Sequence, residues 1–191
     1  MKQNLYKIIL ASNSPRRKEL LSGLDINYET RVLPNVDESY PDSISKTEVA
    51  EYLAKKKAAA YLNKLNEDEL LITADTVVLL NNSILGKPAD KKESALMLRT
   101  LSGKTHKVIT AVCLTSTVKQ ISFSDESLVT FGTLNESEIE YYVSNYEPLD
   151  KAGAYGVQEW IGYVAVEKIE GSYYNVMGLP VYKVYRELKK F

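Results

Sequence analysis

A polar turn after the first apolar run places three cations at the start of an expected helix. Ser14 precedes Pro15, and this pair suits an N-cap followed by the first helical residue, where the missing N–H of proline costs nothing. Arg16, Arg17 and Lys18 then crowd the first turn, where the helix dipole already places partial positive charge. An anion held by backbone N–H groups and guanidinium forks would balance these charges. The turn therefore predicts phosphate binding, with a solvated basic turn as the alternative.

A second feature is a carboxylate at the end of an apolar run. Residues 70–74 are apolar except for one threonine, and Asp75 follows them. Burying a carboxylate is costly unless it is paired or bound to a metal. We therefore expect a short strand that ends at Asp75 and presents it at the carboxyl edge of a sheet, where ligand sites of α/β proteins lie. Lys87 stands in the same region, in a loop constrained by Gly86 and Pro88.

Two adjacent carboxylates, Asp37 and Glu38, lie in an expected loop. Such a pair is usually solvated, and a metal role needs a partner elsewhere in the chain. The sequence has no Cys/His cluster of the zinc-binding kind, so a bound metal would be a hard cation on carboxylate and phosphate oxygens. Lys56 and Lys57 lie side by side near the apolar face of an expected helix, and periodicity does not choose between them.

The elements that must position these residues follow from hydrophobic periodicity and capping signals. The expected strands span residues 6–11, 26–33, 70–80, 107–115, 119–123, 128–134 and 163–169. A first helix begins at Pro15, and further helices are expected over about 45–63, 90–102, 135–145 and 181–190. Capping boxes predict three of these helix starts, at Ser45, Asp90 and Asn135. A turn is expected at 81–82, and loops over 150–158 and 174–180.

Composition narrows the class of protein. A length of 191 residues favours a single domain over 1–191, and a net charge of −1 argues against a nucleic-acid or anionic-membrane binder. The lone cysteine, Cys113, is expected in the core. Because one cysteine allows no disulfide within the chain, and no membrane-spanning or signal-like segment is seen, the sequence predicts a cytoplasmic protein. His106, the only histidine, is expected to make a structural hydrogen bond. Phosphate-loop and dinucleotide-binding fingerprints are absent.

In their order along the chain, six motifs resemble those of the Maf family. They are Ala11-Ser12-Asn13-Ser14-Pro15-Arg16-Arg17 with Glu19-Leu20-Leu21, Ala74-Asp75-Thr76, Gly86-Lys87-Pro88, Leu101-Ser102-Gly103-Lys104-Thr105-His106, Asp150-Lys151-Ala152-Gly153, and Asn175-Val176-Met177-Gly178-Leu179-Pro180. The resemblance covers nearly the whole chain. It implies an α/β fold with a mixed central sheet flanked by helices and two lobes around a deep nucleotide-binding cleft. It also implies nucleoside triphosphate pyrophosphatase activity and an association with arrest of cell division.

The resemblance also implies residue roles. It assigns the proton acceptor to Asp75, the metal to Glu38 with Asp75, the phosphates to Ser14, Arg16, Arg17, Lys57 and Lys87, and a base contact to Gln158. The Leu53-Ala54-x-x-Lys57-Ala58 pattern thus selects Lys57. The implied chemistry is metal-assisted attack of water on the α-phosphorus, with Mg²⁺ or Mn²⁺ as the cofactor. The expected partner is the nucleoside triphosphate, and the formation of a homodimer is left open.

Three positions imply the substrate within this family. Arg16, Thr76 and Gln158 match the subgroup that acts on dTTP and UTP. The amide of Gln158 suits uracil and thymine because it offers a donor for O4 and an acceptor for N3–H. Two alternatives remain open: a pyrophosphatase for purine or modified nucleotides such as 7-methyl-GTP, and a regulator of division that senses nucleotides without hydrolysing them.

Overall fold

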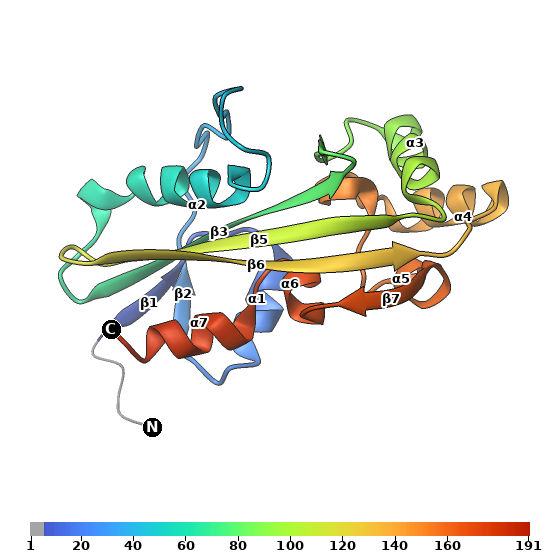
Figure 1. Ribbon diagram of the computed structural model, residues 1–191. Coiled ribbons are helices and arrows are strands. Elements are labelled where there is room, and N and C mark those ends of the chain that lie inside the picture. The colour runs from blue at the N-terminus through green and yellow to red at the C-terminus, as the bar shows by residue number, and fades with distance from the viewer. Residues whose placement is uncertain (1–5) are drawn as a thin grey trace. The chain divides into compact units, whose positions relative to one another are not determined.

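The computed structural model describes residues 6–191, and within them seven strands form one mixed sheet (Figure 1). The strands are β1 (Lys7–Leu10), β2 (Tyr28–Thr30), β3 (Glu69–Leu80), β4 (Ser83–Leu85), β5 (Thr105–Thr115), β6 (Gln120–Phe131) and β7 (Val166–Glu170). Their order is β2-β1-β3-β5-β6-β7, with β4 paired to β3. β1 is parallel to β2 and β3, whereas β4 and β7 pair antiparallel with β3 and β6. The predicted mixed α/β fold is confirmed, and the cleft stays a prediction.

Helices connect and flank the strands. They are α1 (Pro15–Ser22), α2 (Val49–Ala59), α3 (Lys91–Leu101), α4 (Glu136–Tyr146), α5 (Trp160–Ala165), α6 (Tyr173–Met177) and α7 (Val181–Leu188). Short 3-10 turns occur at η1 (Leu62–Lys64), η2 (Pro148–Asp150) and η3 (Ala152–Ala154). Within residues 6–191, no helix combines the length and the apolar character needed to cross a membrane.

The chain divides into two compact units, and the single-domain prediction stays untested. Of the described residues, the first unit comprises 6–75, 110–125 and 178–191, and the second comprises 76–109 and 126–177. Strands β3, β5 and β6 contribute residues to both units. The proposed site residues are divided in the same way: Thr76, Lys87 and Gln158 belong to the second unit, and the others belong to the first.

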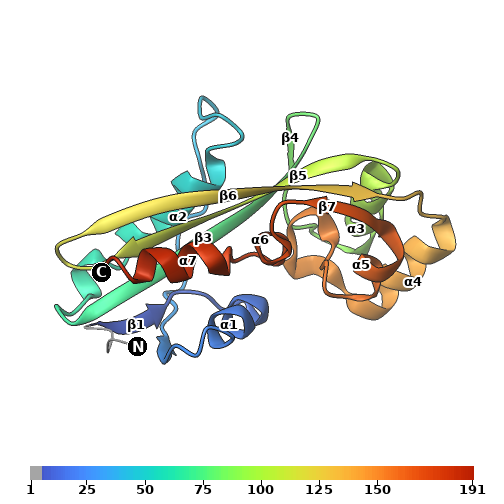
Figure 2. The same ribbon diagram turned by 60° about the horizontal axis from the view of Figure 1, so that its bottom comes forward.

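In the first unit, helices lie on both faces of the strands. α2 lies on one face, and α1 and α7 lie on the other (Figures 1 and 2). The core strand residues Ile9, Leu10 and Leu71 are fully buried. α2 is attached to β3 by a buried hydrogen bond in which Oγ1 of Thr73 donates to the carbonyl oxygen of Ala54 at 2.7 Å. This contact fixes the helix face that carries the lysines.

In the second unit, local signals explain several boundaries. Asn81 and Asn82 have φ values of 49° and 65°, as a two-residue turn between antiparallel strands requires. α3 begins at an N-cap in which Asp90 accepts from the backbone N–H of Glu93. α4 begins with the complete capping box expected at Asn135.

Four expected boundaries were wrong. Ser45 does not cap α2; its hydroxyl pairs with that of Thr47, and the helix begins later, at Val49. The two strands expected over 119–123 and 128–134 are one continuous strand, β6. The strand expected over 163–169 begins as helix α5, and the loop expected over 174–180 contains α6.

Cys113 is buried in the core as expected, and His106 is near a hydrogen-bonding partner as expected. His106 is 2% exposed, and its Nε2 lies 2.7 Å from the hydroxyl of Tyr155. Burial lowers the pKa of His106 to about 4, so the ring is neutral at pH 7. Cys113 is fully buried in β5, and burial raises the pKa of its thiol, which makes it an unreactive core residue.

Candidate active site

The predicted start of α1 is confirmed. Ser14 is the N-cap, and its Oγ accepts from the backbone N–H of Arg17 at 3.5 Å. The backbone N–H of Ser14 in turn donates to Oγ of Ser12 at 3.2 Å, which orders the turn before the helix. Pro15 is the first helical residue, and Arg16 follows it, half-buried, in the first turn. The sequence therefore presents Arg16 and Arg17 at the positive end of the helix, where an anion would be stabilised.

Arg17 joins α1 to two other segments of the first unit. Its Nε donates to the carbonyl oxygen of Gly178 at 2.8 Å, and its Nη1 donates to that of Ala74 at 2.9 Å. Burial lowers the pKa of the guanidinium, while the carboxylate of Asp75 opposes that shift. Arg17 is thus held rigidly beside the residue preceding Asp75. Its contact with a phosphate stays a prediction.

Lys57 brings two of the predicted acidic residues together. Its Nζ lies 2.5 Å from Oδ1 of Asp75 and 2.9 Å from Oε1 of Glu38. The side chains of Lys57 and Asp75 are mostly buried, at 15% and 13% exposed, whereas that of Glu38 is 52% exposed. Because one ammonium group contacts both carboxylates, their oxygens lie close to each other. The lysine compensates the charge that would otherwise make burial of Asp75 unfavourable.

The expected position of Asp75 within its strand was wrong. β3 spans Glu69–Leu80, which agrees with the strand expected over 70–80, so it continues through Val77 and Val78 and Asp75 does not stand at a strand end. The residues after Asp75 are apolar or β-branched, they suit a buried strand, and β4 pairs with their last part. Asp75 is therefore presented from the middle of a long strand, against α2, rather than from a strand end.

Lys56 and Lys57, although adjacent in α2, contact different carboxylates. Its Nζ lies 2.7 Å from Oδ2 of Asp37 and 2.6 Å from the carbonyl oxygen of Ser39. The carboxylate of Asp37 is 65% exposed, and the hydrogen bond from Lys56 lowers its pKa to about 2. Consecutive lysines of α2 thus hold consecutive carboxylates of one loop. Lys57 instead holds the mostly buried Asp75 and the half-exposed Glu38, and its contact with a phosphate stays a prediction.

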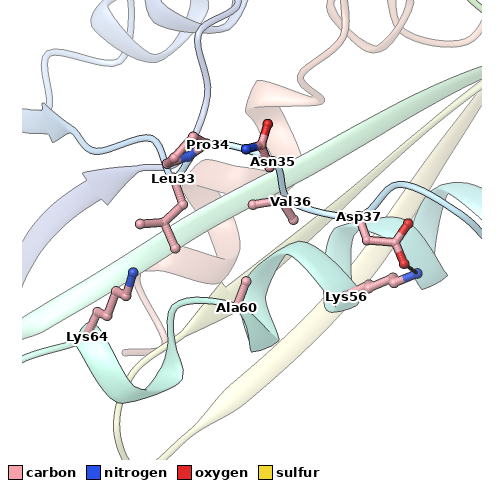
Figure 3. Close-up of a pocket in the computed structure, with 8 residues that line it drawn as sticks. All are labelled: Leu33, Pro34, Asn35, Val36, Asp37, Lys56, Ala60 and Lys64. Carbon is pink, nitrogen blue, oxygen red and sulfur yellow. Dashed lines mark hydrogen bonds and ion pairs between the residues drawn. The ribbon is translucent and has the colours of Figure 1, made fainter.

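A hollow of about 370 Å³ lies beside the Asp37–Lys56 pair (Figure 3). It is lined by Leu33, Pro34, Asn35, Val36, Asp37, Lys56, Ala60 and Lys64. The hollow lies at the C-terminal end of α2, where backbone carbonyls carry partial negative charge. This end of the helix is unfavourable for a phosphate, and none of the predicted site residues lines the hollow.

The acidic residues of the cluster offer a small but suitable set of metal ligands. Among residues 6–191 there is no group of three or more His, Cys, Asp or Glu side chains that could hold a metal by themselves. The carboxylates of Asp75 and Glu38 are neighbours because both contact Nζ of Lys57. Mg²⁺ is commonly held by one or two carboxylates together with substrate phosphates, so these two residues fit such an ion.

The remaining predicted site residues lie in the second unit. Thr76 is half-buried in β3, and Lys87 is exposed in the loop after β4. The carbonyl oxygen of Gly86 accepts from the backbone N–H of Gly153 at 3.0 Å, which ties the Lys87 loop to the segment leading to Gln158. Oε1 of Gln158 is buried and has no hydrogen-bond partner in the described part of the chain. A buried acceptor of this kind is costly unless a ligand supplies its donor.

Sequence reasoning assigned no role to Lys151, although it lies in one of the quoted motifs. It is 7% exposed, and its Nζ contacts Oδ1 of Asp150 at 2.7 Å and Oε1 of Glu159 at 3.2 Å. A buried lysine flanked by acids signals a structural ion pair. The available signal was the polar composition of the segment over 150–159.

A mixed sheet that carries a buried carboxylate among lysine and arginine side chains is suited to phosphorylated substrates, because cations stabilise charge on phosphoryl oxygens. The family model described as "Maf-like protein" matches residues 7–191. The chain therefore belongs to the Maf family, as its motifs predicted.

Curated relatives cover the same length. A protein of Bacteroides thetaiotaomicron named "dTTP/UTP pyrophosphatase" is 58% identical over 97% of this chain and 96% of its own length. Proteins with the same name from Phocaeicola vulgatus and Flavobacterium psychrophilum are 57% and 49% identical, covering 100% and 94% of this chain and 100% and 91% of their own lengths. The structure of the Staphylococcus aureus Ham1 protein covers 95% of this chain and 99% of its own, with a TM-score of 0.54 and 15% identity. At this level of identity, the likeness shows a similar fold alone.

Proposed function

We propose that this chain hydrolyses dTTP and UTP to the nucleoside monophosphate and pyrophosphate. The observation that carries the proposal is the Lys57 ammonium held between Asp75 and Glu38. It unites a buried carboxylate, a cation and a second carboxylate in a chain whose full-length relatives are named dTTP/UTP pyrophosphatase. Those are the groups needed to accept a proton beside a polyphosphate.

In the proposed reaction, Asp75 accepts the proton of the water that attacks the α-phosphorus. The bond between the α-phosphorus and its bridging oxygen to the β-phosphorus breaks, and pyrophosphate leaves. An ammonium group has three N–H donors, so Lys57 can hold both carboxylates and still donate to a phosphate oxygen. Arg16 and Lys87 neutralise further charge on the phosphates, with Ser14 and Arg17 at the helix start.

Asp75 and Glu38 are the residues that would hold a divalent cation, Mg²⁺ or Mn²⁺, together with phosphate oxygens. Bound there, such an ion would lower the pKa of a coordinated water and neutralise phosphate charge. Gln158 receives the base, with Oε1 accepting from N3–H and Nε2 donating to O4, while Arg16 and Thr76 complete the substrate preference. The whole chain, 1–191, acts as one catalytic domain, and we place it in the cytoplasm because its proposed substrates are intracellular nucleotides.

The test is release of pyrophosphate and orthophosphate from dTTP, UTP, CTP, GTP, ATP and 7-methyl-GTP with Mg²⁺ or Mn²⁺. Pyrophosphate from dTTP and UTP alone is the expected result. Release mainly from a purine nucleotide would retain the enzyme class and overturn the substrate assignment. Binding of these nucleotides without any hydrolysis would replace the enzyme by a sensor.

Two matched variants examine the proton acceptor. Asp75→Asn should retain nucleotide binding and lose most turnover, because the amide cannot accept the proton at neutral pH. Asp37→Asn removes a neighbouring carboxylate that pairs with Lys56 and should leave turnover unchanged. Near-normal turnover of Asp75→Asn would contradict the assignment.

A further inference from the structure

The turn that carries Gln158 is built as a closed loop of hydrogen bonds within the second unit. The backbone N–H of Glu159 donates to the carbonyl oxygen of Gly156 at 2.9 Å. The backbone N–H of Gly156 donates to the hydroxyl of Tyr142 at 3.0 Å, and this hydroxyl donates to Oε2 of Glu159. Tyr142 is fully buried in α4. One hydroxyl therefore joins the two residues that flank the dipeptide Val157-Gln158.

The carboxylate of Glu159 is held at both oxygens. Tyr142 contacts Oε2, and Nζ of Lys151 lies 3.2 Å from Oε1. Lys151 is buried, and its ammonium is also paired with Asp150. A carboxylate with both oxygens engaged by groups from two other segments cannot rotate freely. The turn is thus attached to α4 and to the segment after it.

Close packing removes the remaining freedom of the turn. A Cβ atom added at Gly156 would lie 2.9 Å from Nε2 of Gln158 and 2.9 Å from Cδ of Glu159. A Cβ atom at Gly162 would lie 1.8 Å from the carbonyl oxygen of Val157. All three distances are shorter than real Cβ contacts, so the backbone of α5 packs directly against the backbone of Val157, and the side chains of Gln158 and Glu159 lie against Gly156.

Oε1 of Gln158 is buried and unpartnered at the centre of this rigid turn. A rotatable amide would turn its oxygen toward water or toward a protein donor, because an unpaired buried acceptor is unfavourable. The amide of Gln158 and the carboxylate of Glu159 both lie against Gly156, because a Cβ there would be 2.9 Å from Nε2 and 2.9 Å from Cδ, so the held carboxylate limits where the amide can lie. Preorganisation of this kind reduces the entropy lost on binding.

We propose that Tyr142 and Glu159 are positioning residues that fix the orientation of Gln158 and so set discrimination between uracil and cytosine. This inference rests on the proposed function, in which Gln158 receives the base. Uracil and thymine present N3–H and O4, which match the oxygen and the nitrogen of a fixed amide. Cytosine presents an N3 acceptor and an amino group, so it requires the amide to rotate by 180°. Loosening the turn allows that rotation and weakens discrimination.

The experiment compares Tyr142→Phe with Tyr141→Phe in the full chain. Tyr142→Phe removes only the bridging hydroxyl, whereas Tyr141→Phe removes the hydroxyl of an adjacent, 48% exposed tyrosine of α4. Binding of the α,β-methylene analogues of UTP and CTP, which cannot be cleaved at the α–β bridge, is measured by calorimetry. The ratio of kcat/KM for UTP over CTP is measured by pyrophosphate release.

For Tyr142→Phe we expect both the UTP:CTP affinity ratio and the kcat/KM ratio to fall about tenfold, with most of the change in KM, as the loss of one hydrogen-bonded constraint implies. Glu159→Gln keeps an acceptor for Tyr142 but loses the ion pair with Lys151, so both ratios should fall by a smaller factor in this variant. Tyr141→Phe should match the wild type. Urea unfolding of each variant separates a general loss of stability from a change in selectivity.

Two results would overturn the inference: a wild type that binds both analogues equally, or a Tyr142→Phe variant with unchanged ratios. Failure of the proposed function is distinct, because it appears as an absence of pyrophosphate release from UTP and dTTP by the wild type. In that case the analogue affinities still decide whether Tyr142 orients the base-binding turn.

Discussion

Nζ of Lys57 lies 2.5 Å from Oδ1 of Asp75, although 18 positions separate the two residues in the chain. The pair joins α2 to the middle of β3, one turn of helix beyond the hydrogen bond between Thr73 and Ala54. The same helix face therefore supplies both a structural contact and the counter-ion of a proposed catalytic carboxylate.

Replacing Lys57 by methionine tests both roles of this ion pair. We expect kcat for UTP to fall on the order of 100-fold, as when one charge-stabilising donor is removed from an active site. The free energy of unfolding should fall by about 3 kcal/mol, because Asp75 is left buried without its partner. Lys56→Met is the control, since its partner Asp37 is exposed, and it should retain activity. A Lys57→Met enzyme with more than half the wild-type kcat would contradict the assignment.

His106 makes the stability of the fold depend on pH above the range where carboxylates titrate. Burial lowers its pKa in the folded protein from 6.5 to about 4, so the unfolded chain binds the extra proton between these values. Stability must therefore decrease as pH falls from about 6.5 toward 4, by about 2 kcal/mol at pH 5. Urea unfolding at pH 7 and pH 5 measures this slope. His106→Gln should be less stable than the wild type at pH 7 and at pH 5, but its free energy of unfolding should be nearly the same at both. If this variant still lost about 2 kcal/mol between pH 7 and pH 5, the explanation would be refuted.

Glu69 makes the stability of the fold depend on pH in a second, more acidic range. Arg31 donates to both of its carboxylate oxygens, at 2.8 and 2.5 Å, and this hydrogen bonding lowers the pKa of Glu69 to about 2. The stabilisation is present above pH 4.5 and is lost as pH falls through about 2. Glu69→Gln should lower stability at pH 7 and flatten the decline below pH 4.5. Glu29→Gln, which alters an exposed pair with Lys7, should leave the acid limb unchanged.

A methyl group at Gly162 tests the close packing of α5. Gly162→Ala would place Cβ 1.8 Å from the carbonyl oxygen of Val157, so backbone must move, and we expect a loss of about 2 to 3 kcal/mol. Gly23→Ala is the control, because its Cβ would meet only ordinary contacts from 3.5 Å and the residue has helical φ and ψ. Thermal unfolding measures both. Equal melting temperatures for Gly162→Ala and the wild type would show that the turn is not constrained there.

Local chemistry explains which parts of the fold were predictable. The Ser14-Pro15 start of α1, the capping box at Asn135 and the turn at Asn81-Asn82 depend on residues within four positions of one another, and all three were predicted. The ion pair of Lys57 with Asp75 was not predicted: the family motif selected Lys57 over Lys56, but a helical wheel does not show which strand a helix contacts.

The wrong boundaries depend on distant partners. The polar residues 124–127 predict a break between two strands, yet β6 continues through them, with Lys183 paired to Asp125 and Lys107 to Glu126. The residues of α5 have strand-like composition, but they form a helix whose Gly162 approaches the backbone of Val157 so closely that a Cβ would lie 1.8 Å from its carbonyl oxygen. In both places tertiary packing overrides local preference.

Because Cys113 is completely buried, the reactivity of its thiol can report transient opening of the fold. As the single thiol, held in the middle of β5 with a raised pKa, it is closed to alkylating reagents in the folded state. Labelling can then proceed only through molecules in which β5 has transiently separated from its neighbours. The rate at which a maleimide attaches thus counts such openings directly, and nucleotides that tighten the fold should slow it without any probe being engineered.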